Sequence, residues 1–486
     1  MSREKLKEYI LNKAEYPFVL RGMIDTWPAA KWTPYTLSDQ LPEQEIRFRL
    51  GKKSEEDVQW ETGCLYENAT IPQFIEWSHG KCSHGNPLAP YSTVKYWCYA
   101  DYKYMVKLFA EKCDILEAIQ WETFGFPGRQ GDDSTFWLGS QGSYTVCHYD
   151  TYGCNLVAQL YGRKQWLLFS PADMKALYPT RIPYEESSVF SEVNIDLPDL
   201  CRHPRYKEAV PYRVILEPGD VLFVPRQWWH FVKSLDTTIS VNTWIELDCD
   251  NESRLHEAMT RLLACTVMSE MSESDSIQKI WLNPTEVATS FSQNMTYIKQ
   301  VLTCINTDCT TSMTASYQDP EDRSSDVKRQ KLDTVRDGLS AAKSCKLTDR
   351  IASPVDPTVL HHKYKQSLSN RITLDGRKKE YCSTLDKSVV SPLPGSHSVS
   401  DRSPSFIAGE SSMCNDYTIV SDQFDKKHII RIEPDVRQMT ADNTWPDVHN
   451  QKMEEITDEN IINSILHPDV INVICNNLLT SCKIKH

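Results

Sequence analysis

Two histidines and one carboxylate near the middle of the sequence could bind a metal ion together. His148 and Asp150 lie two positions apart at the end of the apolar stretch Tyr144–Asp150, and His230 follows the pair Trp228-Trp229. Successive side chains of a β-strand point to opposite faces, so a strand here would place His148 and Asp150 on the same face. Two imidazoles and one carboxylate on one side of an ion are typical of mononuclear iron(II) enzymes, which keep other coordination positions open. The pattern therefore predicts a catalytic metal site of His148, Asp150 and His230.

The His-x-Asp pattern alone is weak evidence, because it occurs twice in the chain. His467-Pro468-Asp469 has the same spacing, but Pro468 interrupts a helical pattern there, and we do not expect this copy to bind metal. Taken alone, His148 or His230 would more often be a hydrogen-bonded core histidine than a ligand. The prediction therefore depends on both histidines lying on strands of one small domain.

The stretch Thr135–Leu247 supplies the strands that would position these residues. It consists of short apolar runs separated by turns that contain Gly or Pro, such as Tyr161–Lys164 and Glu217–Asp220. Many short strands of this kind indicate a β-sandwich or barrel, in which two strands can bring His148 and His230 together. The predicted strands are Thr135–Gly139, Tyr144–Asp150, Asn155–Leu160, Gln165–Phe169, Val214–Leu216, Val221–Val224, Phe231–Leu235 and Ile239–Leu247.

The tryptophans and the polar segments divide the chain into four parts. Eleven of the 13 tryptophans lie at or before Trp244, which predicts one well-packed domain in the N-terminal half. We expect residues 1–90 to form strands and helices that pack on the core, and residues 91–285 to form the β-core with its C-terminal helices. Residues 286–455 are largely polar and are predicted to be a mostly disordered linker, and residues 456–486 to form short helices. The predicted fold class is mainly β with flanking helices, followed by a disordered tail.

Composition and charge argue against several classes of partner and compartment. The net charge of −13 and the pI near 5.5 disfavour binding to nucleic acid or anionic membranes, and no apolar run approaches the ~18 residues of a membrane span. The 16 cysteines include no CxxC pair, which is typical of the reduced thiols of an intracellular protein. We expect a cytoplasmic protein without nucleic acid or membrane partners. Two basic runs, Lys328–Lys331 and Arg377–Lys379, leave nuclear import as an alternative.

A second group of residues could hold an anionic co-substrate beside the metal. A buried cation with hydroxyl and amide donors is what the far carboxylate of 2-oxoglutarate requires. Lys164 ends the hairpin that follows the ligand strand, Thr145 precedes His148, and Asn155 follows Asp150. From the residues alone, an exposed turn lysine is the favoured alternative for Lys164.

Several spaced motifs resemble the JmjC-domain oxygenases, most closely their small hydroxylase branch. The resemblance covers roughly Tyr16–Leu247 and implies a double-stranded β-helix (jelly-roll or cupin) core. The motifs are Thr145-x-x-His148-x-Asp150, Asn155, Gly162-x-Lys164-x-Trp166, Pro218–Pro225, Trp229-His230 and Val241-Asn242-x-Trp244.

The resemblance also implies roles for individual residues. Fe(II) would be bound by His148, Asp150 and His230, and the 5-carboxylate of 2-oxoglutarate by Lys164 and Thr145. The remaining residues expected to line this pocket are Asn155, Asn242, Trp244 and, on position alone, Tyr99.

Three functions stay open from the sequence. The first is a 2-oxoglutarate-dependent dioxygenase that hydroxylates a protein or peptide; no chromatin-reading or zinc module is found, which disfavours histone demethylation. The second is a non-catalytic chaperone-binding adaptor that keeps the fold, and the third is a structural jelly roll with zinc. The blocks Tyr99–Tyr104, Tyr178–Ser188 and Trp281–Pro284 resemble one family member linked to a small heat-shock protein. That resemblance implies a small heat-shock protein as partner and a role in the stress response.

Overall fold

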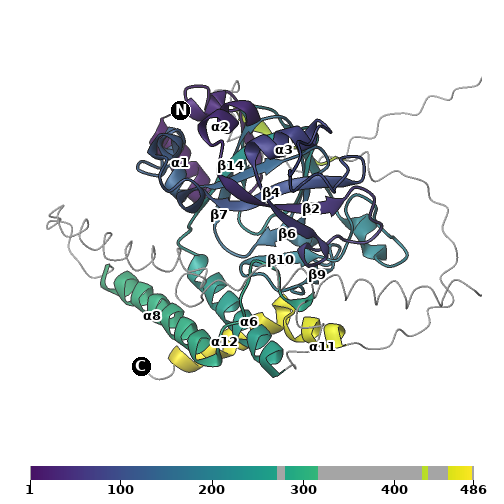
Figure 1. Ribbon diagram of the computed structural model, residues 1–486. Helices are drawn as coiled ribbons and strands as arrows, with labels where there is room; N and C mark the ends of the chain where they lie inside the picture. Colours follow the sequence, from purple (N-terminus) through teal and green to yellow (C-terminus); the bar gives the residue numbers. More distant parts are fainter. Residues whose placement is uncertain (1, 271–279, 316–428, 436–457, 484–486) are drawn as a thin grey trace, which may run out of the picture. The chain divides into compact units, whose positions relative to one another are not determined.

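A computed structural model describes residues 2–270, 280–315, 429–435 and 458–483 (Figure 1). All of them belong to one compact unit, Met1–Asp322 together with Val420–His486. Both basic runs considered for nuclear import, and most of the segment 286–455, lie outside the described residues. Among the helices that the structure describes, none has the length and hydrophobicity needed to cross a bilayer.

The core consists of two antiparallel β-sheets. In spatial order, the nine-stranded sheet contains β15 (Ile429–Arg431), β1 (Phe18–Leu20), β12 (Val221–Val224), β7 (Cys154–Tyr161), β14 (Thr238–Ile245), β5 (Thr135–Gly139), β4 (Tyr96–Tyr104), β2 (Glu45–Lys52) and β3 (Leu65–Thr70). The six-stranded sheet contains β11 (Tyr212–Leu216), β8 (Lys164–Phe169), β13 (Trp229–Ser234), β6 (Tyr144–Asp150), β10 (Ser188–Ser191) and β9 (Pro179–Thr180).

Between β5 and β8, and again between β11 and β14, consecutive strands alternate between the two sheets. This alternation is the strand order of a double-stranded β-helix, and it confirms the predicted fold class. It also separates β7 from β6 and β8, its neighbours in sequence, and places it opposite them across the sandwich. Residues that lie close together in the chain can therefore face each other across one interior.

The two faces of the nine-stranded sheet pack on different apolar clusters. On β7, Val157 points inward and belongs to a cluster with Trp166, Leu168 and Val232 of the other sheet. Leu156 and Ala158, its neighbours, point outward, as the period of two in a strand requires. Three N-terminal helices pack in this outer cluster (Figure 1): α1 (Arg3–Asn12), α2 (Pro34–Gln40) and α3 (Ile71–Ser78).

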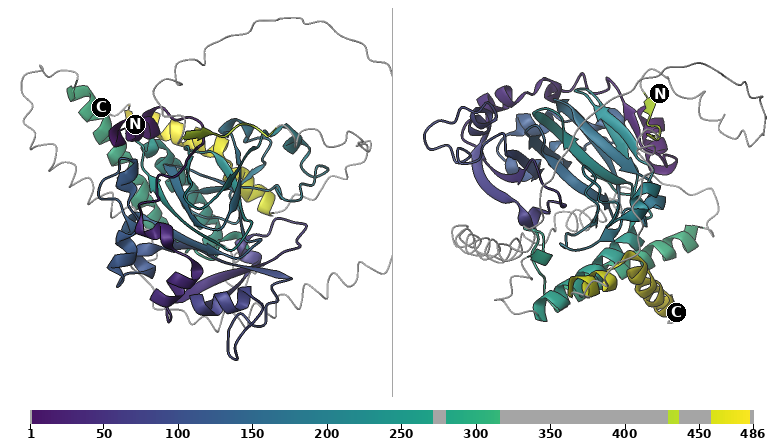
Figure 2. Two further views of the ribbon diagram at one scale, coloured as in Figure 1. Left: turned by 90° about the horizontal axis from the view of Figure 1, so that it is seen from above. Right: turned by 90° about the vertical axis from the view of Figure 1, so that its right-hand side faces the viewer.

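The C-terminal helices form a separate apolar cluster. Helix α6 (Asp250–Glu270) packs against α8 (Phe291–Ala315) and α12 (Pro468–Lys483), and Figure 2 shows these three helices side by side. A fourth helix, α11 (Asp458–Ile465), is joined to α12 by the break at His467-Pro468.

Helix α8 lies at the start of the segment that the sequence predicted to be largely disordered. Its apolar residues recur at helical spacing and pack against Leu255 and Met259 of α6, so the buried contact offsets the cost of ordering a polar stretch. The residues of α8 in this cluster are Met295, Tyr297, Ile298, Val301, Leu302 and Ile305.

Candidate metal and co-substrate site

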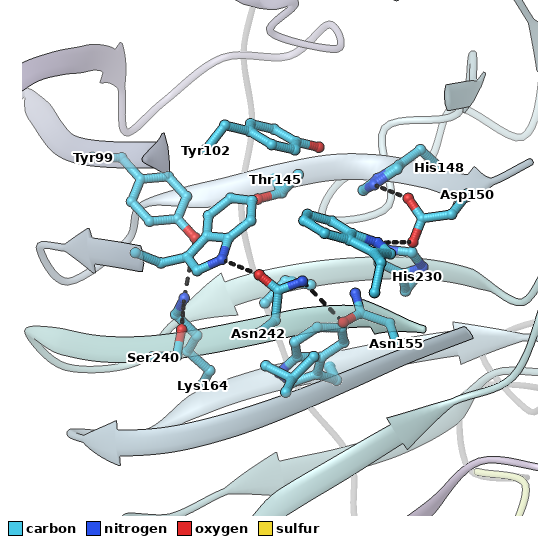
Figure 3. A pocket seen from close by; sticks show the side chains of 15 residues that line it. Tyr99, Tyr102, Thr145, His148, Asp150, Asn155, Lys164, His230, Ser240 and Asn242 are labelled. Atoms are coloured by element: carbon cyan, nitrogen blue, oxygen red, sulfur yellow. Dashed lines mark hydrogen bonds and ion pairs between the residues drawn. The ribbon is translucent and has the colours of Figure 1, made fainter. Parts of the chain in front are cut away.

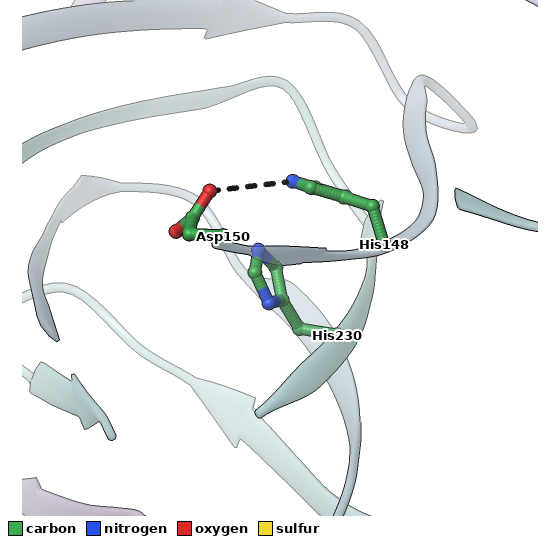
Figure 4. Close-up of side chains that lie close together, drawn as sticks. All are labelled: His148, Asp150 and His230. Carbon is green, nitrogen blue, oxygen red and sulfur yellow. Dashed lines mark ion pairs between the residues drawn. The ribbon is translucent and has the colours of Figure 1, made fainter. Parts of the chain in front are cut away.

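The three predicted metal ligands converge in the structure. Strands β6 and β13 are neighbours, and their register pairs His148 directly with His230, so that the ring centroids lie 4.2 Å apart. Asp150 follows on the same face of β6, and its Oδ1 lies 4.0 Å from His148 Nε2. One candidate ligand atom from each residue lies within 4.8 Å of the others (Figure 4). Both histidines are buried, whereas Asp150 is partly exposed.

Backbone carbonyls orient both imidazole rings. His148 Nδ1 lies 2.8 Å from the carbonyl oxygen of Val146, and His230 Nδ1 lies 3.0 Å from that of Trp228. A carbonyl oxygen only accepts hydrogen bonds, so each Nδ1 must carry the proton, and each Nε2 keeps a free lone pair. Burial lowers the pKa of both histidines to about 4, and for His148 the nearby His230 adds to this effect. The rings are therefore neutral at physiological pH, which is the form that binds metal.

The carboxylate is also held by a neighbour. Trp244 Nε1 donates a hydrogen bond of 2.9 Å to Asp150 Oδ2, which leaves Oδ1 directed toward His148. Burial raises the pKa of Asp150 above its ordinary value, although His148 and the Trp244 hydrogen bond act in the opposite direction. A divalent cation would reverse this rise. Two ring nitrogens and one carboxylate oxygen from one side fit iron(II) with open positions, and they also fit zinc.

Lys164 lies at the other end of the same cavity (Figure 3). Its side chain is 2% exposed, and Nζ donates hydrogen bonds to Ser240 Oγ at 2.8 Å and Tyr99 Oη at 3.1 Å. Among the described residues it forms no ion pair. Burial lowers the pKa of Lys164 to about 7, while Asp101 acts in the opposite direction. The alternative of an exposed turn lysine is therefore wrong, and a buried amino group faces this cavity.

The other predicted pocket residues line this cavity as well. Asn242 Nδ2 donates to Asn155 Oδ1 at 2.9 Å, and Trp137 Nε1 donates to Asn242 Oδ1 at 2.7 Å. Thr145 lies on β6, and its hydroxyl is hydrogen-bonded to Tyr99. All six residues expected around the co-substrate are thus brought together: Tyr99, Thr145, Asn155, Lys164, Asn242 and Trp244.

Several residues that line the cavity are not predicted by the sequence. Ser240 could have been found, because it precedes Asn242 and Trp244 on β14 at the same period of two. Tyr102 could not. It lies where the register between β4 and β5 shifts, with a φ of 51°, so counting along the strand gives no face for its side chain. The other missed lining residues are Trp137, Val157, Trp166 and Val232.

The aromatic and acidic loop Tyr178–Phe190 is packed against the C-terminal helices. Arg181 forms a buried, two-point ion pair with Glu257 of α6, at 2.6 and 2.9 Å. Thr180 donates a hydrogen bond of 2.9 Å to Asn463 of α11. The loop then enters β10, where Phe190 pairs with His148. The metal-ligand strand is thereby connected to the C-terminal helices.

Comparison with known proteins identifies relatives of this chain. The family model described as Cupin-like domain matches residues 3–251. HSPB1-associated protein 1 of Homo sapiens is 46% identical over 332 residues, which cover 68% of this chain and 67% of that protein. The protein of the same name from Bos taurus is 49% identical over 298 residues, 61% of each chain. Lysine-specific demethylase 8 of Xenopus tropicalis is 28% identical over 235 residues, 47% of each chain. The matches therefore span only part of each relative's length.

Proposed function

Because this chain belongs to the cupin-like domain family, we propose that it is an Fe(II)- and 2-oxoglutarate-dependent oxygenase that hydroxylates a protein or peptide. One observation carries the proposal: a single cavity has three potential metal ligands at one end and, at the other, a buried lysine that pairs with no carboxylate in the described part of the chain. A structural zinc site would need no such lysine. A demethylase 8 among the relatives is a further link to this chemistry.

The residues divide the work between them. His148, Asp150 and His230 would hold the ion. A bound iron(II) ion would supply the chemistry in which O₂ is the oxidant: one oxygen atom enters the C–H bond of the substrate, and the other enters 2-oxoglutarate, which loses CO₂ and becomes succinate. Lys164 would bind the distal carboxylate, because a buried ammonium group is stabilised by a negative partner. Asn155 and Asn242 present amide groups between the two ends. The aromatic side chains that line the cavity would limit the access of water to it.

Succinate formation tests this proposal. The full-length chain is purified without oxygen, its metal content is determined, and it is incubated with Fe(II), 2-oxoglutarate and O₂. We expect succinate formation that requires iron and stops when zinc replaces it. Stoichiometric zinc in the anaerobically purified chain would favour the structural zinc site. Bound iron and bound 2-oxoglutarate without succinate would favour the adaptor.

A small heat-shock protein is the partner we propose for this chain. Support comes from the relatives named HSPB1-associated protein 1. We also propose a cytoplasmic location and a role in the stress response. These proposals are independent of catalysis. Co-purification of the full-length chain with such a protein tests it, and equal recovery with an iron-free preparation would show that the partner does not need the metal.

Binding of 2-oxoglutarate should weaken as the pH rises above 7. The anion needs protonated Lys164, whose pKa in the free protein is lowered to about 7 by burial. Above this pKa the protonated fraction falls about tenfold per pH unit, so the dissociation constant should rise roughly 50-fold from pH 7 to pH 9. Calorimetric titration with Mn(II) in place of iron measures this constant.

The variant Lys164→Met shows whether the pH dependence of 2-oxoglutarate binding comes from Lys164 or from another titrating group. It should bind 2-oxoglutarate roughly 10- to 100-fold more weakly at pH 7, because a charge-assisted hydrogen bond is lost, and its affinity should not change with pH. An equal pH dependence in both proteins would contradict the assignment of Lys164 to the carboxylate.

A further inference from the structure

The short segment Ile429–Asp435 lies across the edges of both sheets. Its strand β15 pairs antiparallel with β1, so that Ile430 lies opposite Val19. Further along, Pro434 forms an antiparallel bridge with Tyr212 of β11, the edge strand of the six-stranded sheet. The N–H of Asp435 donates a hydrogen bond of 2.7 Å to the carbonyl oxygen of Pro211. The segment therefore binds a composite edge that consists of β1 and the start of β11.

One side chain anchors the segment in the core. Ile432 is 7% exposed and belongs to the apolar cluster between the sheets, together with Val19, Leu222 and Trp228. Ile430, by contrast, is 38% exposed, and Glu433 is exposed as well. Burial of one isoleucine contributes about 1.5–3 kcal/mol, and a three-residue strand adds few backbone hydrogen bonds. The segment is thus held by few contacts.

The segment Ile429–Asp435 binds an edge formed by residues that lie far from it in the sequence, as a separate peptide ligand would. Residues 316–428 precede it and residues 436–457 follow it, and both stretches lie outside the described part of the chain. Binding of a segment of the same chain is intramolecular, so weaker contacts suffice to hold it than a separate peptide would need. An untethered copy of the same peptide at micromolar concentration could not displace it. A peptide with better contacts at the positions of Ile430 and Glu433 could do so.

We propose that the composite edge, Phe18–Leu20 with Pro211–Tyr212, is a binding site for an extended peptide of another protein, and that Ile429–Asp435 occupies this site in cis. An unpaired sheet edge offers backbone donors and acceptors that an added strand satisfies. The peptide would carry an aliphatic side chain at the position of Ile432 and a proline two residues later, where no N–H is needed. This interaction is separate from the proposed oxygenase activity.

Competition between the cis segment and a free peptide tests the proposal. The probe is a fluorescent peptide of sequence Ile429–Asp435 with blocked ends, and its binding to the full-length chain is measured by anisotropy. Ile432→Asp places a charge in the apolar cluster and should release the cis segment, so the peptide should bind roughly tenfold or more tightly than to the wild type. Ile430→Asp changes an exposed residue of the same strand and should behave like the wild type. The peptide that carries Ile432→Asp should not bind.

Two further measurements make the outcome decisive. Faster tryptic cleavage at Arg431 reports release of the segment, and a chain with a Gly-Ser sequence of equal length in place of Ile429–Asp435 lacks it altogether. If neither the released variant nor the replaced chain binds the peptide better than the wild type, the proposal is wrong. Light scattering that finds a wild-type dimer lost in Ile432→Asp would make a second copy the occupant and would overturn the assignment to another protein. None of these readouts depends on succinate formation.

Discussion

Replacement of His148 by alanine should reduce iron-dependent succinate formation to the background of the assay. The ring supplies one of three ligands, and its Nε2 is kept free by the hydrogen bond between Nδ1 and Val146. Loss of a residue that only supports a metal ligand costs about 10- to 100-fold in affinity or activity, so loss of the ligand should cost at least ~100-fold. Iron content after dialysis and the rate of succinate formation should fall together.

His467→Ala is the matched control for this prediction. His467 has the same spacing to an aspartate as His148, but it lies at the break between α11 and α12, where its Nδ1 is 3.7 Å from Asp469 Oδ2 and both side chains are exposed. Its replacement should leave iron content and turnover unchanged. Succinate formation that survives His148→Ala at the wild-type rate would count against the oxygenase and for the adaptor.

Glu257→Gln should lower the free energy of unfolding by about 3–5 kcal/mol. Glu257 and Arg181 form a two-point ion pair with side chains only 5% and 4% exposed. Removal of one partner leaves a buried charge uncompensated, and this is the costly change in such a pair. Arg181 Nη2 also donates a hydrogen bond of 3.2 Å to the carbonyl oxygen of Glu185, but no second carboxylate of the described residues pairs with the guanidinium. Urea unfolding followed by tryptophan fluorescence measures the difference.

Acid should remove the same stabilisation. Burial alone would raise the pKa of Glu257, but Arg181 more than compensates, and the pKa lies below the ordinary value of 4.5. As the pH falls, Glu257 therefore becomes protonated at a lower pH in the folded protein than in the unfolded chain. The contribution is complete above pH 4.5 and disappears as the pH falls through the folded pKa. The difference in the free energy of unfolding between the wild type and Glu257→Gln should therefore become smaller as the pH falls through that range.

Asp236→Asn is the control variant, because it removes an ion pair of similar geometry that is exposed instead of buried. Arg163 Nε lies 2.7 Å from Asp236 Oδ2, a distance similar to that in the buried pair, but the two side chains are 50% and 41% exposed. Exposed ion pairs add little to stability, so the unfolding midpoint should hardly change. If Glu257→Gln and Asp236→Asn lowered the free energy of unfolding by similar amounts, burial would not be the reason for the large effect expected of Glu257→Gln.

Some residues of this site can be predicted from local sequence patterns, whereas others depend on contacts with distant parts of the chain. His148 and Asp150 follow from strand periodicity, which is local. That His230 pairs with His148 follows from the register of β6 and β13, which depends on all the turns between them. Lys164 was predicted through family resemblance, because burial of a turn lysine depends on strands far away in the sequence.

Elements that depend on distant partners were not predictable. Strand β15 contains three residues and exists because β1 offers an unpaired edge. Helix α8 is polar enough to suggest disorder until α6 is present to cover its apolar side. The bulge that turns Tyr102 into the cavity has no local composition signal, since no glycine occurs there.

The ion pair between Arg181 and Glu257 also limits how far this protein can be truncated at its C-terminal side. The family match ends at residue 251, in the first turn of α6, so an expression fragment designed on that boundary lacks Glu257. Such a fragment keeps the guanidinium of Arg181 without its carboxylate, a few residues before the strand that pairs with His148. A shortened protein intended for crystallisation or assay should therefore retain the whole of α6.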